Sequence, residues 1–132
     1  MSIGPSAHVS WKEVNCHNGV PYPEKWYYER LFPLLDIFES LRERWGAPIQ
    51  ILSCYRTPEY NASIGGARHS QHVEGRALDL TPADPFEAGH DVATFHRFIR
   101  DMLPSYSLVK GHGVYSWGDH IDIRPSSVLI SW

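Results

Sequence analysis

Two stretches of the sequence carry side chains that could bind a metal ion. The first holds His72 and Asp79, and the second holds His120 and Asp122. Two histidines and one carboxylate make up the protein ligands of many catalytic zinc sites, which keep one coordination position open for water. If two neighbouring strands present these four side chains, the sequence predicts such a site.

The residues around these side chains have the alternation of strands. Leu78 and Leu80 share one face by the two-residue period of a strand, so Asp79 points to the other face. Ile121 and Ile123 alternate in the same way with the polar residues of the second stretch. Because burying an unpaired charge is costly, a carboxylate in this position needs a cation or a metal ion beside it.

Length and composition favour an ordinary globular domain. The chain has 132 residues, 42% hydrophobic and 20% charged, so we expect one domain over residues 1–132. A net charge of −3 argues against nucleic acid as a partner. No apolar run approaches the length of a membrane span. We expect a monomer that does not insert into membranes.

The N-terminal residues lack the basic and apolar regions of a signal peptide, which predicts synthesis in the cytoplasm. Cys16 and Cys54 are too few for a disulfide framework. They could pair, but free buried thiols are the expected state of a cytoplasmic product. A zinc site built from His8, Cys16 and His17 is the weaker alternative, since their spacing does not match a closed zinc site.

Helical and strand patterns alternate along the chain. The expected elements, in order, are a helix over 24–45 interrupted at Pro33, a strand over 49–53, a short helical segment after Pro58, a strand through Asp79, a helix between Asp91 and Pro104, strands over 106–110 and 114–115, the strand through His120, and an apolar tail over 128–132 that packs on the core. This order predicts an α+β fold, with a mainly antiparallel sheet flanked by helices.

Four motifs lie between about His8 and Arg124. They are Tyr55-Arg56-Thr57-Pro58-Glu59-Tyr60-Asn61 with Gly65-Gly66, Ser70-x-His72-x-x-Gly75-x-Ala77-x-Asp79, Gly-x-Gly-x-Tyr over 111–115, and His120-x-Asp122. Together they resemble the zinc D-alanyl-D-alanine carboxypeptidase and L-alanyl-D-glutamate endopeptidase superfamily, in particular short phage endolysins and bacterial murein peptidases.

The resemblance implies the small α+β fold shared with the signalling domain of hedgehog proteins. It implies one zinc ion per chain, held by His72, Asp79 and His120. It also implies hydrolysis of a peptide bond in the stem or cross-link peptide of peptidoglycan, by a carboxypeptidase or an endopeptidase. Such a protein would be made in the cytoplasm and act on the cell wall, for example after phage-type release.

One position departs from the pattern of the superfamily. Many members carry an acid three residues before the last histidine, where this chain has Trp117. Asp119 should point to the opposite face of its strand, whereas Asp122 shares a face with His120. We therefore expect Asp122 to act as the general base.

Four further side chains are candidates for substrate binding. Arg56 follows a predicted strand, and its planar fork suits a substrate carboxylate. Ser70, His112 and Tyr115 could hydrogen-bond the peptide or the developing oxyanion. For Ser70 and Tyr115, a local turn bond or packing explains their presence equally well.

Two alternatives to an enzyme stay open. Because fold does not fix function, the chain could be a catalytically inactive, zinc-stabilised module that binds the cell wall. It could also be a domain without a metal ion. Release of fragments from cell walls separates the enzyme from the binding module, and elemental analysis tests for the metal.

Overall fold

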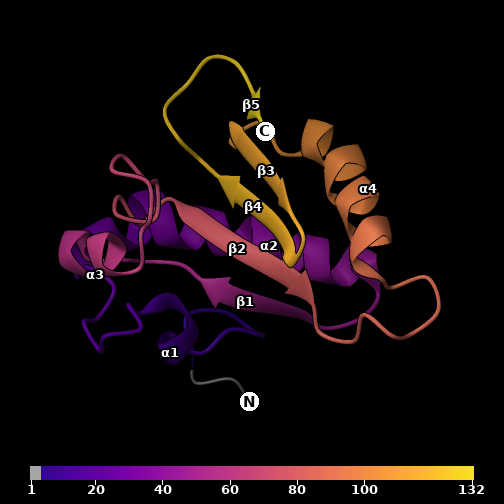
Figure 1. Cartoon of the computed structure of the whole chain (residues 1–132), viewed down its shortest axis with the longest axis horizontal. Helices are drawn as coiled ribbons and strands as arrows, with labels where there is room; N and C mark the ends of the chain where they lie inside the picture. Colours follow the sequence, from indigo (N-terminus) through magenta and orange to yellow (C-terminus); the bar gives the residue numbers. More distant parts are fainter. Residues whose placement is uncertain (1–3) are drawn as a thin grey trace.

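The computed structural model of the protein describes residues 4–132. A five-stranded sheet forms its centre, with helices packed against it (Figure 1). The elements in chain order are α1 (Trp11–Val14), the 3₁₀ turn η1 (Glu24–Trp26), the π-helical turn η2 (Tyr27–Leu31), α2 (Phe32–Trp45), β1 (Ile49–Ser53), α3 (Pro58–Ser63), β2 (Ala77–Pro82), α4 (Val92–Met102), the 3₁₀ turn η3 (Leu103–Ser105), β3 (Gly111–Tyr115), β4 (Gly118–Asp122) and β5 (Ile130–Ser131).

The strands lie in the order β1-β2-β4-β3-β5. All neighbouring pairs are antiparallel except β3 and β5, which run parallel. The predicted α+β fold with a mainly antiparallel sheet is confirmed. Strands β2 and β4 are neighbours inside the sheet, and their register places Asp79 directly opposite His120.

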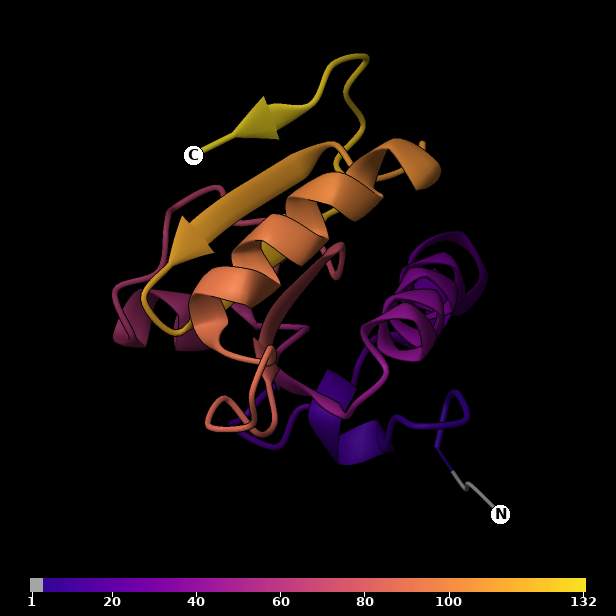
Figure 2. The ribbon, with the colours of Figure 1, turned by 90° about the vertical axis from the view of Figure 1, so that its right-hand side faces the viewer.

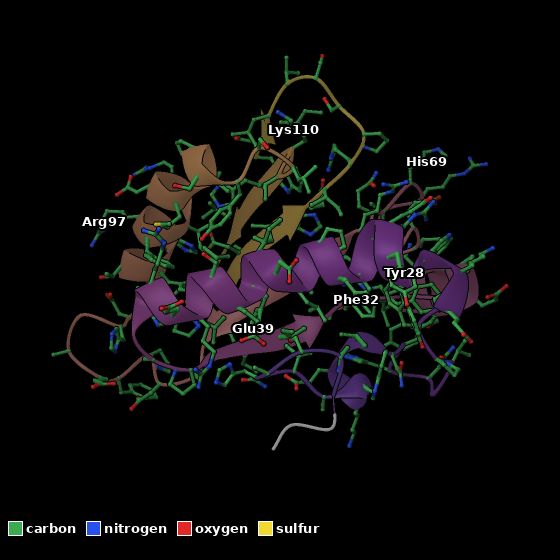
Figure 3. The ribbon with its side chains drawn as sticks, turned by 180° about the vertical axis from the view of Figure 1, so that it is seen from behind. Tyr28, Phe32, Glu39, His69, Arg97 and Lys110 are labelled. Carbon is green, nitrogen blue, oxygen red and sulfur yellow. The ribbon has the colours of Figure 1, made fainter. Side chains whose placement is uncertain are left out.

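The two faces of the sheet have different surroundings. Helices α2 and α4 pack on one face, which we call the helix face (Figures 1, 2 and 3). Leu78, Leu80 and Ile121 point into the core on this side and are fully buried. Asp79 and His120 therefore point to the other face, which we call the site face. The alternation predicted for both strands is confirmed.

Both long helices end as predicted and α4 begins as predicted, whereas α2 begins at Phe32 and not at residue 24. The helical segment is interrupted near Pro33, because η1 and η2 precede α2 and the proline occupies the first turn of α2. Gly46 ends this helix. The carboxylate of Asp91 accepts a hydrogen bond from the backbone N–H of Thr94 and caps α4.

The strands before β4 differ from the prediction. Residues 106–110 form a turn, and the single strand β3 covers Gly111–Tyr115 in place of separate strands over 106–110 and 114–115. Glycines usually break strand patterns, but here the strand needs one. A Cβ atom at Gly111 would collide with the carboxylate of Asp122 on β4, so only glycine allows the two strands to approach.

The prediction that the C-terminal tail packs on the core is wrong. Val128, Leu129 and Trp132 remain 62%, 45% and 47% exposed. The tail instead runs along the sheet edge, where β5 pairs with β3. The helices already cover the helix face of the sheet, so the tail adds an edge strand and not a core segment.

Two further expectations concern the chain as a whole. Cys16 and Cys54 are buried free thiols, as expected. None of the helices in residues 4–132 is long and apolar enough to cross a membrane.

Candidate metal centre

His72, Asp79 and His120 come together on the site face, as predicted. Each offers one ligand atom, and these atoms lie within 4.8 Å of one another. Oδ1 of Asp79 is 3.0 Å from Nε2 of His72 and 3.0 Å from Nδ1 of His120. In the described part of the chain this is the one such group of histidine, cysteine and carboxylate side chains. The site considered around His8, Cys16 and His17 is not formed there.

The orientation of His72 is fixed by the strand before it. Its Nδ1 lies 2.6 Å from the backbone carbonyl of Cys54, so Nδ1 carries the proton and donates it to this oxygen. Burial lowers the pKa of His72, and this effect outweighs the attraction of the Asp79 carboxylate, which would raise it. The lowered pKa favours the neutral imidazole ring. The lone pair is then on Nε2, which is buried and makes no hydrogen bond, because the neighbouring Oδ1 of Asp79, 3.0 Å away, is an acceptor as well.

An unpaired buried nitrogen needs a reason, because such groups usually find partners. Nε2 of His72 faces Asp79 and His120, and a metal ion between the three would satisfy it. The donor set, two imidazole nitrogens and one carboxylate oxygen, also suits a catalytic metal site. The residues present therefore fit a metal ion.

His120 is held by Asp122, on the side of its ring that points away from His72 and Asp79. Its Nε2 lies 2.8 Å from Oδ2 of Asp122, while Nδ1 faces Asp79. Burial alone would lower the pKa of His120, but hydrogen bonds to Asp122 and Asp79 outweigh it and raise this pKa. A carboxylate in this position typically orients a metal-binding imidazole and strengthens it as a ligand.

The prediction that Asp122 is the general base does not fit this position. Asp122 is fully buried, and Arg124 donates to both of its oxygens at 2.8 and 2.7 Å. Burial opposes its ionisation, but the hydrogen bonds from Arg124 and His120 outweigh burial and lower the pKa of Asp122. A buried carboxylate with both oxygens engaged is poorly placed to take a proton from water.

Arg56 lies beside the ligands, fixed by three contacts. Its guanidinium donates to Oγ of Ser53 at 3.1 Å, to Oδ1 of Asn61 at 3.2 Å and to Oδ2 of Asp79 at 3.2 Å. Arginine has five N–H donors, so two remain for a substrate. Burial would raise the pKa of Asp79, but the contacts of this carboxylate with His120 and His72 outweigh burial and hold its pKa low.

The three ligands open into a cavity of about 740 Å³. Arg56, Ser70 and Tyr115 line this cavity, so the structure brings these predicted binding residues together with the ligands. His112 is not among them. Its position in β3 turns it to the helix face, where Nε2 lies 2.6 Å from Oδ2 of Asp119.

Asp119 also lies on the helix face, as predicted, and is fully buried. It bridges the sheet to α4, because Nδ1 of His96 lies 2.5 Å from Oδ1 of Asp119. Helical periodicity places His96 on the polar side of α4, which by itself indicates a surface residue. Its role was missed because the contact joins residues 23 positions apart, and neither helix nor strand periodicity relates them.

Tyr115 belongs to an aromatic wall whose other members, Trp117 and Trp132, were not predicted as part of the site. The rings of Tyr115 and Trp117 stack 4.9 Å apart, almost parallel. The indole N–H of Trp132 donates to the hydroxyl of Tyr115 at 2.6 Å, and its ring lies 5.2 Å from that of His120. All three line the cavity. The aromatic content of the sequence was the only available sign of this wall.

No curated protein sequence matches the chain. Residues 8–123, which include all three candidate ligands, match the family model described as Peptidase M15. This match confirms the resemblance seen in the sequence motifs and agrees with the α+β fold and the ligand cluster. The chain therefore belongs to the Peptidase M15 family of metallopeptidases.

Proposed function

We propose that this protein hydrolyses a peptide bond in the stem or cross-link peptides of peptidoglycan, with one zinc ion held by His72, Asp79 and His120. The observation that carries the proposal is the unpaired, buried Nε2 of His72, which faces the other two ligands. Membership of the Peptidase M15 family supports the reaction class.

The donor set favours zinc over other metals. Two imidazoles and one carboxylate with an open side are typical of catalytic zinc, whereas magnesium and calcium prefer oxygen ligands. Zinc held by these residues would supply a Lewis acid for the scissile carbonyl and would lower the pKa of a bound water towards neutrality. The open side faces the 740 Å³ cavity, which gives the substrate access.

The residues around the ligands have distinct proposed roles. Asp122 orients His120 and does not exchange protons with the substrate. The two free N–H donors of Arg56 bind a substrate carboxylate. The hydroxyl of Tyr115 accepts from Trp132 and so keeps its own proton to donate to the substrate. The hydroxyl of Ser70 accepts from the backbone N–H of His72 and is likewise left free to donate.

Purified cell-wall sacculi test this proposal. Protein loaded with one equivalent of zinc should release peptide fragments that mass spectrometry detects, and the chelated protein should release none. Binding to sacculi without release, in the presence of zinc, would instead favour the alternative of a zinc-stabilised binding module.

A further inference from the structure

A second cavity, of about 270 Å³, adjoins the one described above. Both cavities are lined by Arg56, Asp79 and Trp117, so they meet beside Asp79, one of the three candidate ligands. The remaining walls differ. The second cavity is bounded by α3 with the residue after it, by β1 and by the loop between α1 and η1, through residues that include Tyr60, Ile64 and His17.

The order of the strands shows how the two cavities are related. The ligands Asp79 and His120 lie on the neighbouring interior strands β2 and β4. The second cavity contains Leu52 and Ser53 of the edge strand β1, whereas the larger cavity contains Ile130 of the opposite edge strand β5. The cavities thus extend from the ligands towards opposite edges of the sheet.

Arg56 lies where the cavities meet. A carboxypeptidase has to hold the carboxylate at the end of its substrate, and the bound chain stops at that group. A carboxylate bound by Arg56 would have open space on both sides, so it suits an acidic group inside a chain. The other arginines of the larger cavity do not mark a closed end, because Arg124 is paired with Asp122 and Arg68 is exposed on the loop before Ser70.

We propose that the two cavities hold peptide on both sides of the cleaved bond, which makes the site that of an endopeptidase. This inference rests on the proposed function and narrows its substrate class. In the reaction the C–N bond breaks, the hydroxyl of water joins the carbonyl carbon, and the leaving nitrogen takes the proton. Both products are then fragments larger than a free amino acid.

The second cavity has the surface expected for a peptide subsite. Ile64 is 49% exposed beside it, and the hydroxyl of Tyr60 lies 3.3 Å from Nδ1 of His17. Apolar walls with a few polar groups are typical of ligand-binding sites. Binding energy from such remote contacts can be used to accelerate the chemical step, so occupancy of both cavities should appear in kcat/KM.

The test compares substrates from one preparation of sacculi. Zinc-loaded protein is given uncross-linked muropeptides that end in D-alanyl-D-alanine, and cross-linked dimers, and products are identified by mass spectrometry. We expect cleavage at internal bonds without free D-alanine. We also expect kcat/KM to be about tenfold or more higher for peptides extended on both sides of the bond than for peptides that end one residue after it.

Free D-alanine as the main product, with dimers left intact, would overturn the inference of an endopeptidase. It would leave the proposal of a zinc peptidase valid. Hydrolysis of neither substrate in the presence of zinc would overturn the proposed function and this inference with it.

A pair of tyrosine variants tests the second cavity itself. Tyr60→Ala should raise KM for the extended peptides about tenfold while zinc content and far-UV circular dichroism stay unchanged. Tyr28→Ala is the matched control, because Tyr28 is 84% exposed and lines neither cavity (Figure 3). Ile64→Ala repeats the test should Tyr60→Ala misfold. An unchanged KM in a folded variant would show that this cavity holds no substrate.

Discussion

The substitution Asp122→Asn tests whether Asp122 orients His120 or acts as the general base. The carboxylate accepts from Nε2 of His120 at 2.8 Å and from Arg124 through two side-chain bonds and one backbone bond. Asparagine has nearly the same shape but only one acceptor oxygen, so it cannot serve both partners. His120 would then lose its support on the side away from the metal ligands.

The size of the effect follows from these contacts. Removal of a carboxylate that orients a metal-binding histidine typically weakens metal affinity about 10–100-fold. Hydrogen bonds to charged groups contribute about 1.5–3 kcal/mol each. Since the side chain of Arg124 is 23% exposed and water can solvate it in part, we expect the metal-free variant to lose about 2 kcal/mol of unfolding free energy.

Zinc affinity is measured by competition with a chelator, and hydrolysis is measured with zinc in excess. The orienting role predicts weaker zinc binding and a rate that excess zinc largely restores. Asp101→Asn, at an exposed position of α4, should change neither quantity. Intact zinc affinity with a rate about 10²–10⁴-fold lower at saturating zinc would refute this reasoning and restore Asp122 as the general base.

Four other outcomes follow from the structure. His72→Ala should lose zinc and activity, which elemental analysis and fragment release measure together. Arg56→Lys keeps the charge but loses the planar fork, so KM for a carboxylate-bearing peptide should rise, and unchanged kinetics would make Arg56 a structural residue only. Asp119→Asn should lower the unfolding free energy by about 1–3 kcal/mol, seen in urea denaturation, while zinc stoichiometry stays at one. The folded protein holds the pKa values of Asp79 and Asp122 below the ordinary aspartate value of about 3.9. The stability that these two carboxylates contribute to the metal-free protein is therefore complete above about pH 3.9. It is lost as the pH falls through their lower pKa values in the folded state. Denaturation curves of chelated protein from neutral to acidic pH should show this loss.

The ligand cluster was predictable because it depends on local rules. The two-residue period of a strand assigns Leu78 and Leu80 to the core and Asp79 to the opposite face, whatever the rest of the chain does. The same rule places His120 and separates it from Asp119. Pairing of the two strands then brings the ligands together.

Other features depend on contacts that no local pattern encodes. The face of His112 depends on where β3 begins, and a strand that starts at Gly111 turns its side chain towards α4. Asp122 shares a face with His120, as predicted, but its role depends on the bidentate contact with Arg124. Trp132 reaches the site through pairing of β5 with β3, a connection that its apolar neighbours in sequence did not indicate.

The most direct test of the proposed zinc peptidase is a metal-reconstitution experiment on sacculi. Chelated protein, the same protein with one equivalent of zinc, and zinc-treated His120→Ala are incubated with sacculi, and released fragments are identified by mass spectrometry. We predict fragments from the reconstituted protein alone. Equal release by the chelated protein or by His120→Ala would contradict a zinc peptidase built on His72, Asp79 and His120.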